Sequence, residues 1–229
     1  MKIFKNKKVI VALVALVAAV AIAVSSALLT IAYLTSSAAV SNVFTIGNVG
    51  ITMTESQVKP DGTMTDGGAT QVDTNTYHLI PGKTYIKDPR ITVNEGSVGS
   101  YLFVLVRNDL EKIEDKTKPT IAQQLEAKGW AKYTQASTGW VYVYVGAGNV
   151  PSDDTLATTA AKVTPGTYKL FDTFSVDPNA DIAPYGAAKI TLTAVAIQDE
   201  GFSTLADAWT AVVDTYPYIH TGSNTGSNP

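Results

Sequence analysis

The sequence contains no cysteine, and this absence removes several kinds of chemistry at once. Disulfide bonds, thiolate nucleophiles and cysteine-ligated zinc sites are all excluded. Small domains that rely on disulfides in oxidising compartments use cross-links that this chain does not have. Its stability must therefore come from assembly or from burial of its hydrophobic residues, which make up 45% of the chain.

Charged side chains are also scarce, at 16% of the residues, where an average soluble protein has about 25%. Four of the 17 Lys and Arg are Lys2, Lys5, Lys7 and Lys8. If residues 1–32 are removed, 13 Lys and Arg remain against 20 Asp and Glu, a net charge of −7. Because phosphate contacts need clustered basic side chains, we expect no nucleic-acid partner.

Histidine is nearly absent: the chain has only His78 and His220, 142 residues apart. A His-Glu-x-x-His helix, which places two imidazoles on one face for zinc, is missing. A serine nucleophile needs a histidine base, and the sequence has no Gly-x-Ser-x-Gly elbow. We therefore predict that the protein is not an enzyme and has no catalytic residues, no cofactor and no metal.

One segment has the beginnings of a calcium loop. Asp177, Asn179 and Asp181 supply oxygens at alternate positions, as an EF-hand does. However, Ile182 stands where that loop needs glycine, and Ala188 stands where it needs a bidentate glutamate. We therefore interpret the segment as an Asp-Pro turn between strands.

The N-terminus has the pattern of an export signal. The basic residues 1–8 precede an apolar stretch from Val9 to Leu34, interrupted by Ser25 and Ser26. This order predicts a secretory signal peptide over residues 1–32 and a protein that is secreted or held at the cell surface. The alternative is a permanent membrane anchor, because the 26 residues of the stretch exceed the roughly 20 that span a bilayer as a helix.

The residues after this stretch carry a series of motifs. Thr30-Ile-Ala-Tyr-Leu-Thr35 is followed by Asn42-Val-Phe-Thr-Ile-Gly-Asn-Val-Gly-Ile-Thr-Met-Thr-Glu55. The junction resembles that of the TasA/camelysin family, which a SipW-type signal peptidase processes. Leu34 stands for the usual Phe and Met53 for the usual Leu, and both remain apolar.

The resemblance covers most of residues 30–212, apart from residues 110–170. It extends over four further motifs, in the same order as in TasA-like domains: His78-Leu-Ile-Pro-Gly-Lys83, Asp88-Pro-Arg-Ile-Thr-Val93, Ser100-Tyr-Leu-Phe-Val-Leu-Val-Arg-Asn108, and Thr193-Ala-Val-Ala-Ile-Gln198 with Phe202 and Ala208-Trp209.

The resemblance implies cleavage after Ala32, so that Tyr33 becomes the first residue of the mature chain. A plain small-x-small rule offers Ala38 or Ala39 instead. The family resemblance also implies a jelly-roll fold and a structural subunit of extracellular fibres or biofilm matrix. The expected partners are further copies of the chain, an accessory matrix protein and, during export, the signal peptidase.

The mechanism that the resemblance implies is strand donation, in which an N-terminal segment completes the sheet of the neighbouring subunit. Residues 33–43 are the candidate donor strand here, with Leu34, Ser36, Ala38, Val40 and Val43 as its pairing residues. Two alternatives stay open: a secreted camelysin-like metallopeptidase, and a surface module that does not polymerise.

The residue types of the rest of the chain predict β-structure independently of the resemblance. Runs of β-branched and aromatic residues, separated by turns such as Pro81-Gly82, predict seven or eight short strands. Their number and turns favour a jelly-roll-like β-sandwich. The expected strands are 44–54, 74–79, 85–93, 101–106, 140–145, 168–176 and 189–197.

Two short helices are expected to interrupt the strands. The first covers residues 119–128 and stops at Gly129. The second covers residues 205–214, and Thr204 with Asp207 forms its capping box.

The predicted organisation is a signal helix at 1–32, an N-terminal segment at 33–43, one all-β domain at 44–218 and a flexible tail at 219–229. Trp209 is expected to close one end of the core. The predicted core residues are Tyr101, Phe103, Leu105, Ile190, Leu192 and Trp209.

Overall fold

The computed structural model describes residues 35–36, 41–152, 155–217 and 219. The predicted signal helix, its cleavage site at Ala32 and Tyr33, and the tail from His220 lie outside these residues. Leu34, Ala38 and Val40 of the candidate donor strand also lie outside them. No helix within the described part is long and apolar enough to cross a membrane.

The largest sheet has five strands in the order β2-β13-β8-β10-β9. Its two longest strands, β8 and β13, pair antiparallel over their full length, and β10 continues the sheet antiparallel to β8. β2 pairs parallel to β13 at one edge. The strands are β2 (Ser41–Ile46), β8 (Ser100–Asn108), β9 (Trp130–Ala136), β10 (Gly139–Tyr144) and β13 (Ile190–Gln198).

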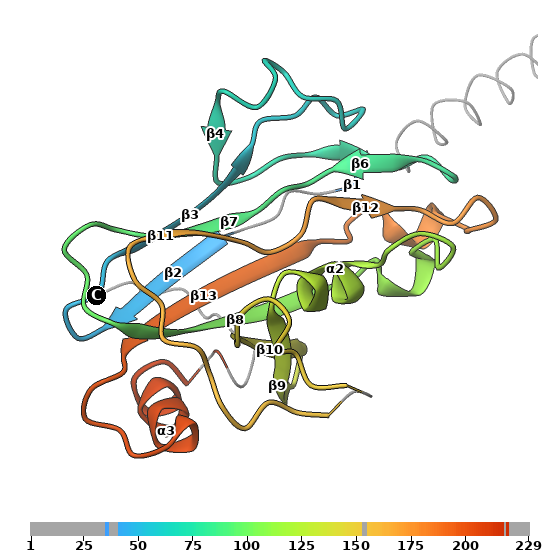
Figure 1. Cartoon of the computed structure of the whole chain (residues 1–229). Coiled ribbons are helices and arrows are strands. Elements are labelled where there is room, and N and C mark those ends of the chain that lie inside the picture. Colours follow the sequence, from blue (N-terminus) through green and yellow to red (C-terminus); the bar gives the residue numbers. More distant parts are fainter. Residues whose placement is uncertain (1–34, 37–40, 153–154, 218, 220–229) are drawn as a thin grey trace, which may run out of the picture.

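A second, four-stranded sheet has the order β11-β7-β3-β4, and two small sheets pair β1 with β5 and β12 with β6. Figure 1 shows β3, β7 and β11 in one layer and β2, β13 and β8 in the next. The strands are β1 (Thr35–Ser36), β3 (Ile51–Ser56), β4 (Gln71–Val72), β5 (Tyr77–His78), β6 (Thr84–Ile86), β7 (Arg90–Val93), β11 (Gly166–Lys169) and β12 (Thr173–Ser175).

The five-stranded sheet is buried on both faces. One face packs against the second sheet and forms the main core, to which β8 contributes Leu102, Val104 and Val106. The other face forms a second core with the C-terminal helix α3 (Leu205–Thr215), to which β8 contributes Phe103 and Leu105. Because successive strand residues point to opposite faces, β8 is an apolar run without alternation.

Both predicted helices are present with small shifts of their ends. α2 spans Ile121–Ala127, and a capping box of Thr120 and Gln123 sets its start, one residue after Pro119. α3 begins after the predicted capping box of Thr204 and Asp207. Two single-turn 3₁₀ helices, η2 (Glu111–Ile113) and η3 (Ala183–Tyr185), complete the described helical structure.

The described residues thus form an all-β fold with two short α-helices. Three of the long predicted strands are each divided in two, because the chain passes from one sheet to another at residues 47–50, 87–89 and 170–172. β9 was not predicted. Its burial does not alternate, and a bulge interrupts its pairing with β10, so its sequence lacks a clear period of two.

Candidate functional site

The N-terminal edge of the five-stranded sheet is the first candidate site. β2 pairs in register from Ser41 opposite Leu192 to Ile46 opposite Ile197. Gly47, at φ +86°, then turns the chain away toward β3 in the other layer. The strand therefore lies across the predicted boundary at residue 44, and its first three residues belong to the candidate donor segment.

The side chains of β2 that the structure describes are those of Val43, Thr45 and Ile46. None of its side chains that the structure describes is buried: Val43 is 38% exposed, and Thr45 and Ile46 are half-buried. The main chain of β2 pairs with β13 along the whole strand, and an edge of this kind is a surface at which a strand from another chain can pair.

The two edges of this sheet differ. On the far side, the chain returns along β9, and the Ala157 N–H donates to the Lys132 carbonyl over 2.8 Å. At the β2 edge, the Tyr216 hydroxyl, just beyond α3, donates to the Thr45 carbonyl over 3.0 Å. A side-chain hydroxyl thus bonds to the main chain of β2, and a main-chain N–H bonds to that of β9.

The other described part of the predicted donor segment is β1. Thr35 and Ser36 pair antiparallel with His78 and Tyr77 of β5. Both described parts of the segment, Ser36 on β1 and Val43 on β2, thus pair with strands of the same chain in this structure.

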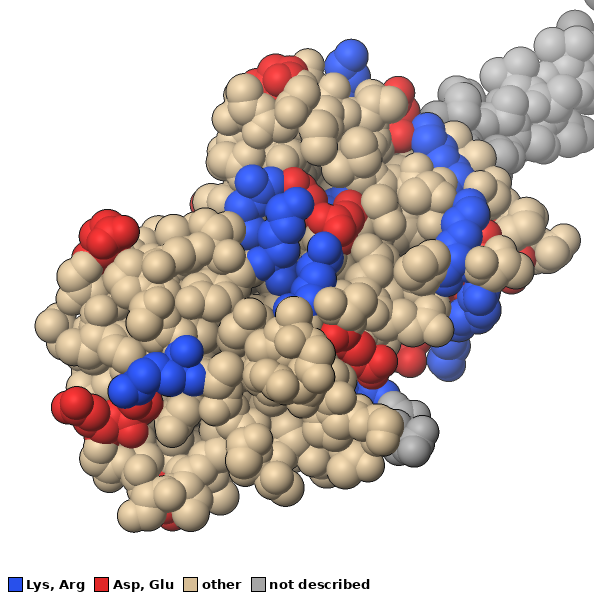
Figure 2. Space-filling model, in the orientation of Figure 1, with Lys and Arg blue, Asp and Glu red and all other residues tan. Residues whose placement is uncertain are grey.

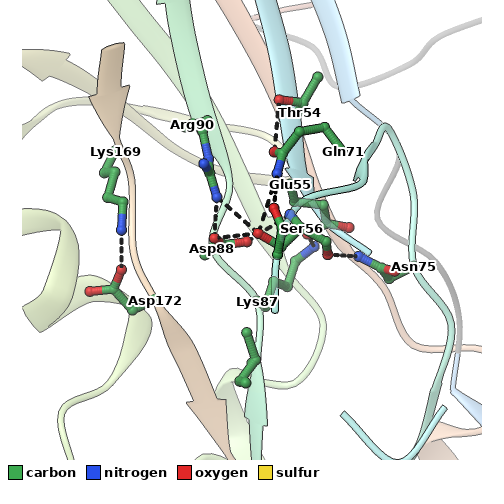
Figure 3. A network of polar contacts seen from close by, with 12 residues as sticks. Thr54, Glu55, Ser56, Gln71, Asn75, Lys87, Asp88, Arg90, Lys169 and Asp172 are labelled. Carbon is green, nitrogen blue, oxygen red and sulfur yellow. Dashed lines mark hydrogen bonds and ion pairs between the residues drawn. The ribbon is translucent and has the colours of Figure 1, made fainter. Parts of the chain in front are cut away.

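A cluster of buried charges lies on β3 and on the residues just before β7 (Figure 3). Lys87 Nζ donates to Glu55 Oε2 over 2.6 Å, and the two side chains are 1% and 3% exposed. Burial lowers the pKa of Lys87, and the adjacent Glu55 carboxylate opposes that shift. Glu55 Oε1 has no hydrogen-bond partner among the described residues, so this pair is incompletely satisfied.

Asp88 extends the cluster toward the surface. Its carboxylate accepts from the Ser56 N–H and hydroxyl, both over 2.8 Å, and pairs with the Arg90 guanidinium. Asn75 closes the other end by donating to the Ser56 carbonyl over 2.9 Å. The hydrogen bonds fix the end of β3 against its neighbours, so we assign the cluster a structural role.

The sequence did not predict this cluster, although its residues lie in or next to the motifs that resemble the TasA/camelysin family. Glu55 ends the first motif, and Asp88 begins the Asp-Pro-Arg motif directly after Lys87. Glu55 and Lys87 are 32 residues apart, and no local signal indicated that the two motifs meet. The face drawn in Figure 2 is mainly uncharged, with small groups of mixed sign.

The predicted core residues divide between the two cores. Ile190 and Leu192 are buried between the sheets, and Phe103 and Leu105 are buried beneath α3.

Tyr101 and Trp209 are only half-buried, which differs from the prediction. Trp209 does not close an end of the sandwich. It lies on the outer face of the sheet, with its ring centroid 5.1 Å from that of Phe103 and 5.6 Å from that of Tyr133.

His220 lies outside the described residues, and neither His78 nor the candidate calcium segment forms a metal site within them. His78 is exposed on β5. The Asp177 carboxylate accepts from the Asn179 N–H over 2.7 Å, and Asp181 accepts from the Ala183 N–H over 3.1 Å, so both form local turns. Among the described residues, no group of three His, Asp or Glu is placed to hold a metal ion.

Comparisons with known proteins return no match to any protein-family model and none to any curated protein. The edge strand and the motifs listed above are therefore the basis for a functional assignment.

Proposed function

We propose that this chain is a secreted structural subunit of extracellular fibres or biofilm matrix, assembled by donation of an N-terminal strand between copies. The observation that carries the proposal is β2, an edge strand at the N-terminal end of the described domain without a buried described side chain. The motif order that resembles TasA-like proteins supports it, as does the export signal that the sequence predicts over residues 1–32.

The proposed mechanism is strand exchange. In a lone chain, residues 41–46 occupy the edge of β13. In a fibre, the segment 33–43 of one copy pairs at that edge in the next copy, and the jelly-roll sheet is completed there. The segment contains no charged residue, Gly or Pro, so it extends and pairs without electrostatic cost or loss of ladder donors.

Electron microscopy of chains that begin at Tyr33 tests this mechanism. The full mature chain should form fibres, and deletion of residues 33–42 should leave a folded monomer that does not. A free peptide of residues 33–43 should also stop fibre growth by occupying the open edge. Circular dichroism checks that the truncated chain remains folded.

A matched pair of substitutions distinguishes the loss of main-chain pairing from a change of side chain in the segment. Ala38→Pro removes a main-chain donor and should act like the deletion, whereas Ala38→Val keeps the donor and should still polymerise. Fibres of normal length from the truncated chain would exclude donation by this segment. A mature chain that stays monomeric under all conditions would favour the non-polymerising surface module.

A further inference from the structure

A hollow of about 150 Å³ opens between the β9–β10 hairpin and the start of α2. It lies away from β2, at the opposite end of the sheet order. Pockets for drug-sized ligands measure roughly 300–1,000 Å³, so this hollow is suited to a single ring. Its lining combines an aromatic wall with polar groups: Trp140, Asn108, Glu111, Glu114, Lys116 and Lys132.

The aromatic wall is set by the register of the sheet. Trp140 on β10 lies opposite Val106 of β8, and the residue before it, Gly139, allows the two strands to approach. A Cβ at Gly139 would lie 2.2 Å from the Val106 carbonyl oxygen, so only glycine fits there. Trp140 is half-buried, and Lys132 Nζ lies 5.3 Å from the centre of its ring.

Glu114 is the most buried charged group in the lining. Its side chain is 5% exposed, and burial raises its pKa. The carboxylate accepts from Asn108 Nδ2 and from the Ile121 N–H over 3.2 Å each, and from Lys116 Nζ over 3.4 Å. These contacts are long, and they hold the carboxylate in place at the wall of the hollow.

The charges of the lining balance. Two carboxylates, Glu111 and Glu114, and two ammonium groups, Lys116 and Lys132, line the same hollow, and Asn108 adds an amide. A strongly charged ligand of either sign would be repelled by two of these four charged groups. Hydroxyl groups instead donate to the carboxylates and accept from the ammonium groups. The chemistry that uses both the aromatic face and the mixed polar groups is that of a pyranose, which has an apolar C–H face and a rim of hydroxyls.

We propose that this hollow binds one sugar ring of a neutral polysaccharide, with the C–H face of the ring against Trp140 and its hydroxyls on the Glu111 and Glu114 carboxylates. The site would give the protein an attachment to a glycan. The hollow lies away from β2, so its test does not depend on fibre formation.

Titration calorimetry and saturation-transfer NMR on the full chain test the site. The probes are cellotetraose and chitotetraose as neutral sugars, and tetragalacturonic acid as the anionic comparison. At least one neutral probe should bind with a Kd in the millimolar range or tighter, and the anionic probe should bind more weakly. No binding of either neutral probe, or preference for the anion, would overturn the proposal.

Two variants and one control locate the binding. Trp140→Ala and Glu111→Gln should each weaken binding of the neutral probe about tenfold or more. Glu111 is exposed, so its variant tests the site even if Trp140→Ala does not fold. Trp209→Phe, on α3 beyond the other face of the sheet, should leave the affinity unchanged. Equal affinity of Glu111→Gln and the unaltered chain would show that the sugar binds elsewhere.

Discussion

At the scale of single residues, the buried ion pair of Lys87 and Glu55 is the feature with the largest expected effect on the stability of the fold. Two charges removed from water recover the cost of their burial only with good geometry and full hydrogen bonding. Here the geometry is close, at 2.6 Å, but Glu55 Oε1 lacks a described partner. The pair is thus expected to fix the pairing of its strands more than to add stability.

A double-mutant cycle tests this expectation. Lys87→Met leaves an uncompensated buried carboxylate and should lower the free energy of unfolding by about 3–5 kcal/mol. Adding Glu55→Leu removes both charges and should recover most of that loss. Urea unfolding of the four proteins measures the cycle. If the double variant is as unstable as the single one, the pair itself stabilises the fold.

A surface pair provides the control for this cycle. Lys169 lies 3.3 Å from Asp172, and the two side chains are 50% and 47% exposed. Lys169→Met should therefore change stability by no more than about 1 kcal/mol.

The buried Glu114 carboxyl is expected to make the stability of the fold depend on pH. Because burial raises its pKa above the ordinary value of 4.5, the folded chain binds this proton more tightly than the unfolded chain does. The resulting stability is complete below pH 4.5 and is lost as the pH rises through the higher folded pKa.

Glu114→Gln removes this contribution. The unaltered chain should therefore lose stability relative to the variant when urea unfolding is repeated at neutral pH instead of well below pH 4.5. Glu95→Gln, at an exposed position, is the control. A difference between Glu114→Gln and the unaltered chain that does not change with pH would contradict the assignment.

At the scale of secondary-structure elements, β8 and β13 form the centre of the molecule. Each strand has side chains in both the core between the sheets and the core beneath α3. Both are nine residues long, and each is flanked by strands on both sides within the sheet. Loss of packing in either strand should therefore destabilise the whole domain.

Truncations on the two faces test this. Leu192→Ala, between the sheets, and Leu105→Ala, beneath α3, should each cost about 2–5 kcal/mol by cavity formation. Leu156→Ala is the matched control, because that side chain is 44% exposed. Thermal unfolding measures all three. An unchanged melting temperature for Leu105→Ala would mean that α3 and its core contribute little to the stability of the domain.

At the scale of the whole molecule, the start of the mature chain decides whether a donor segment exists. The family resemblance places cleavage after Ala32, which leaves residues 33–43 ahead of the domain. N-terminal sequencing of the secreted protein should therefore begin at Tyr33. A start at Ala39 or later would remove most of the donor segment and contradict both the cleavage site and the proposed assembly.

Features encoded by short stretches of the chain were predictable. The capping box of Thr204 and Asp207 and the stop at Gly129 depend on neighbouring residues, and both helices were placed within two residues at their ends. Gly129, at φ +88°, has a backbone conformation that side chains other than glycine's rarely adopt. The β-rich composition likewise indicated the fold class.

The sequence by itself determined the β class, the two helices and the export-like N-terminus, because propensity, capping and apolar period act within a few residues. Only the tertiary structure decided that Glu55 meets Lys87, that β2 lies parallel to β13 and that Trp140 shares a hollow with Glu114. These contacts join residues 26 or more positions apart in the chain. Their formation depends on which sheet edges and faces are left open once the strands pair, and no local pattern carries that information.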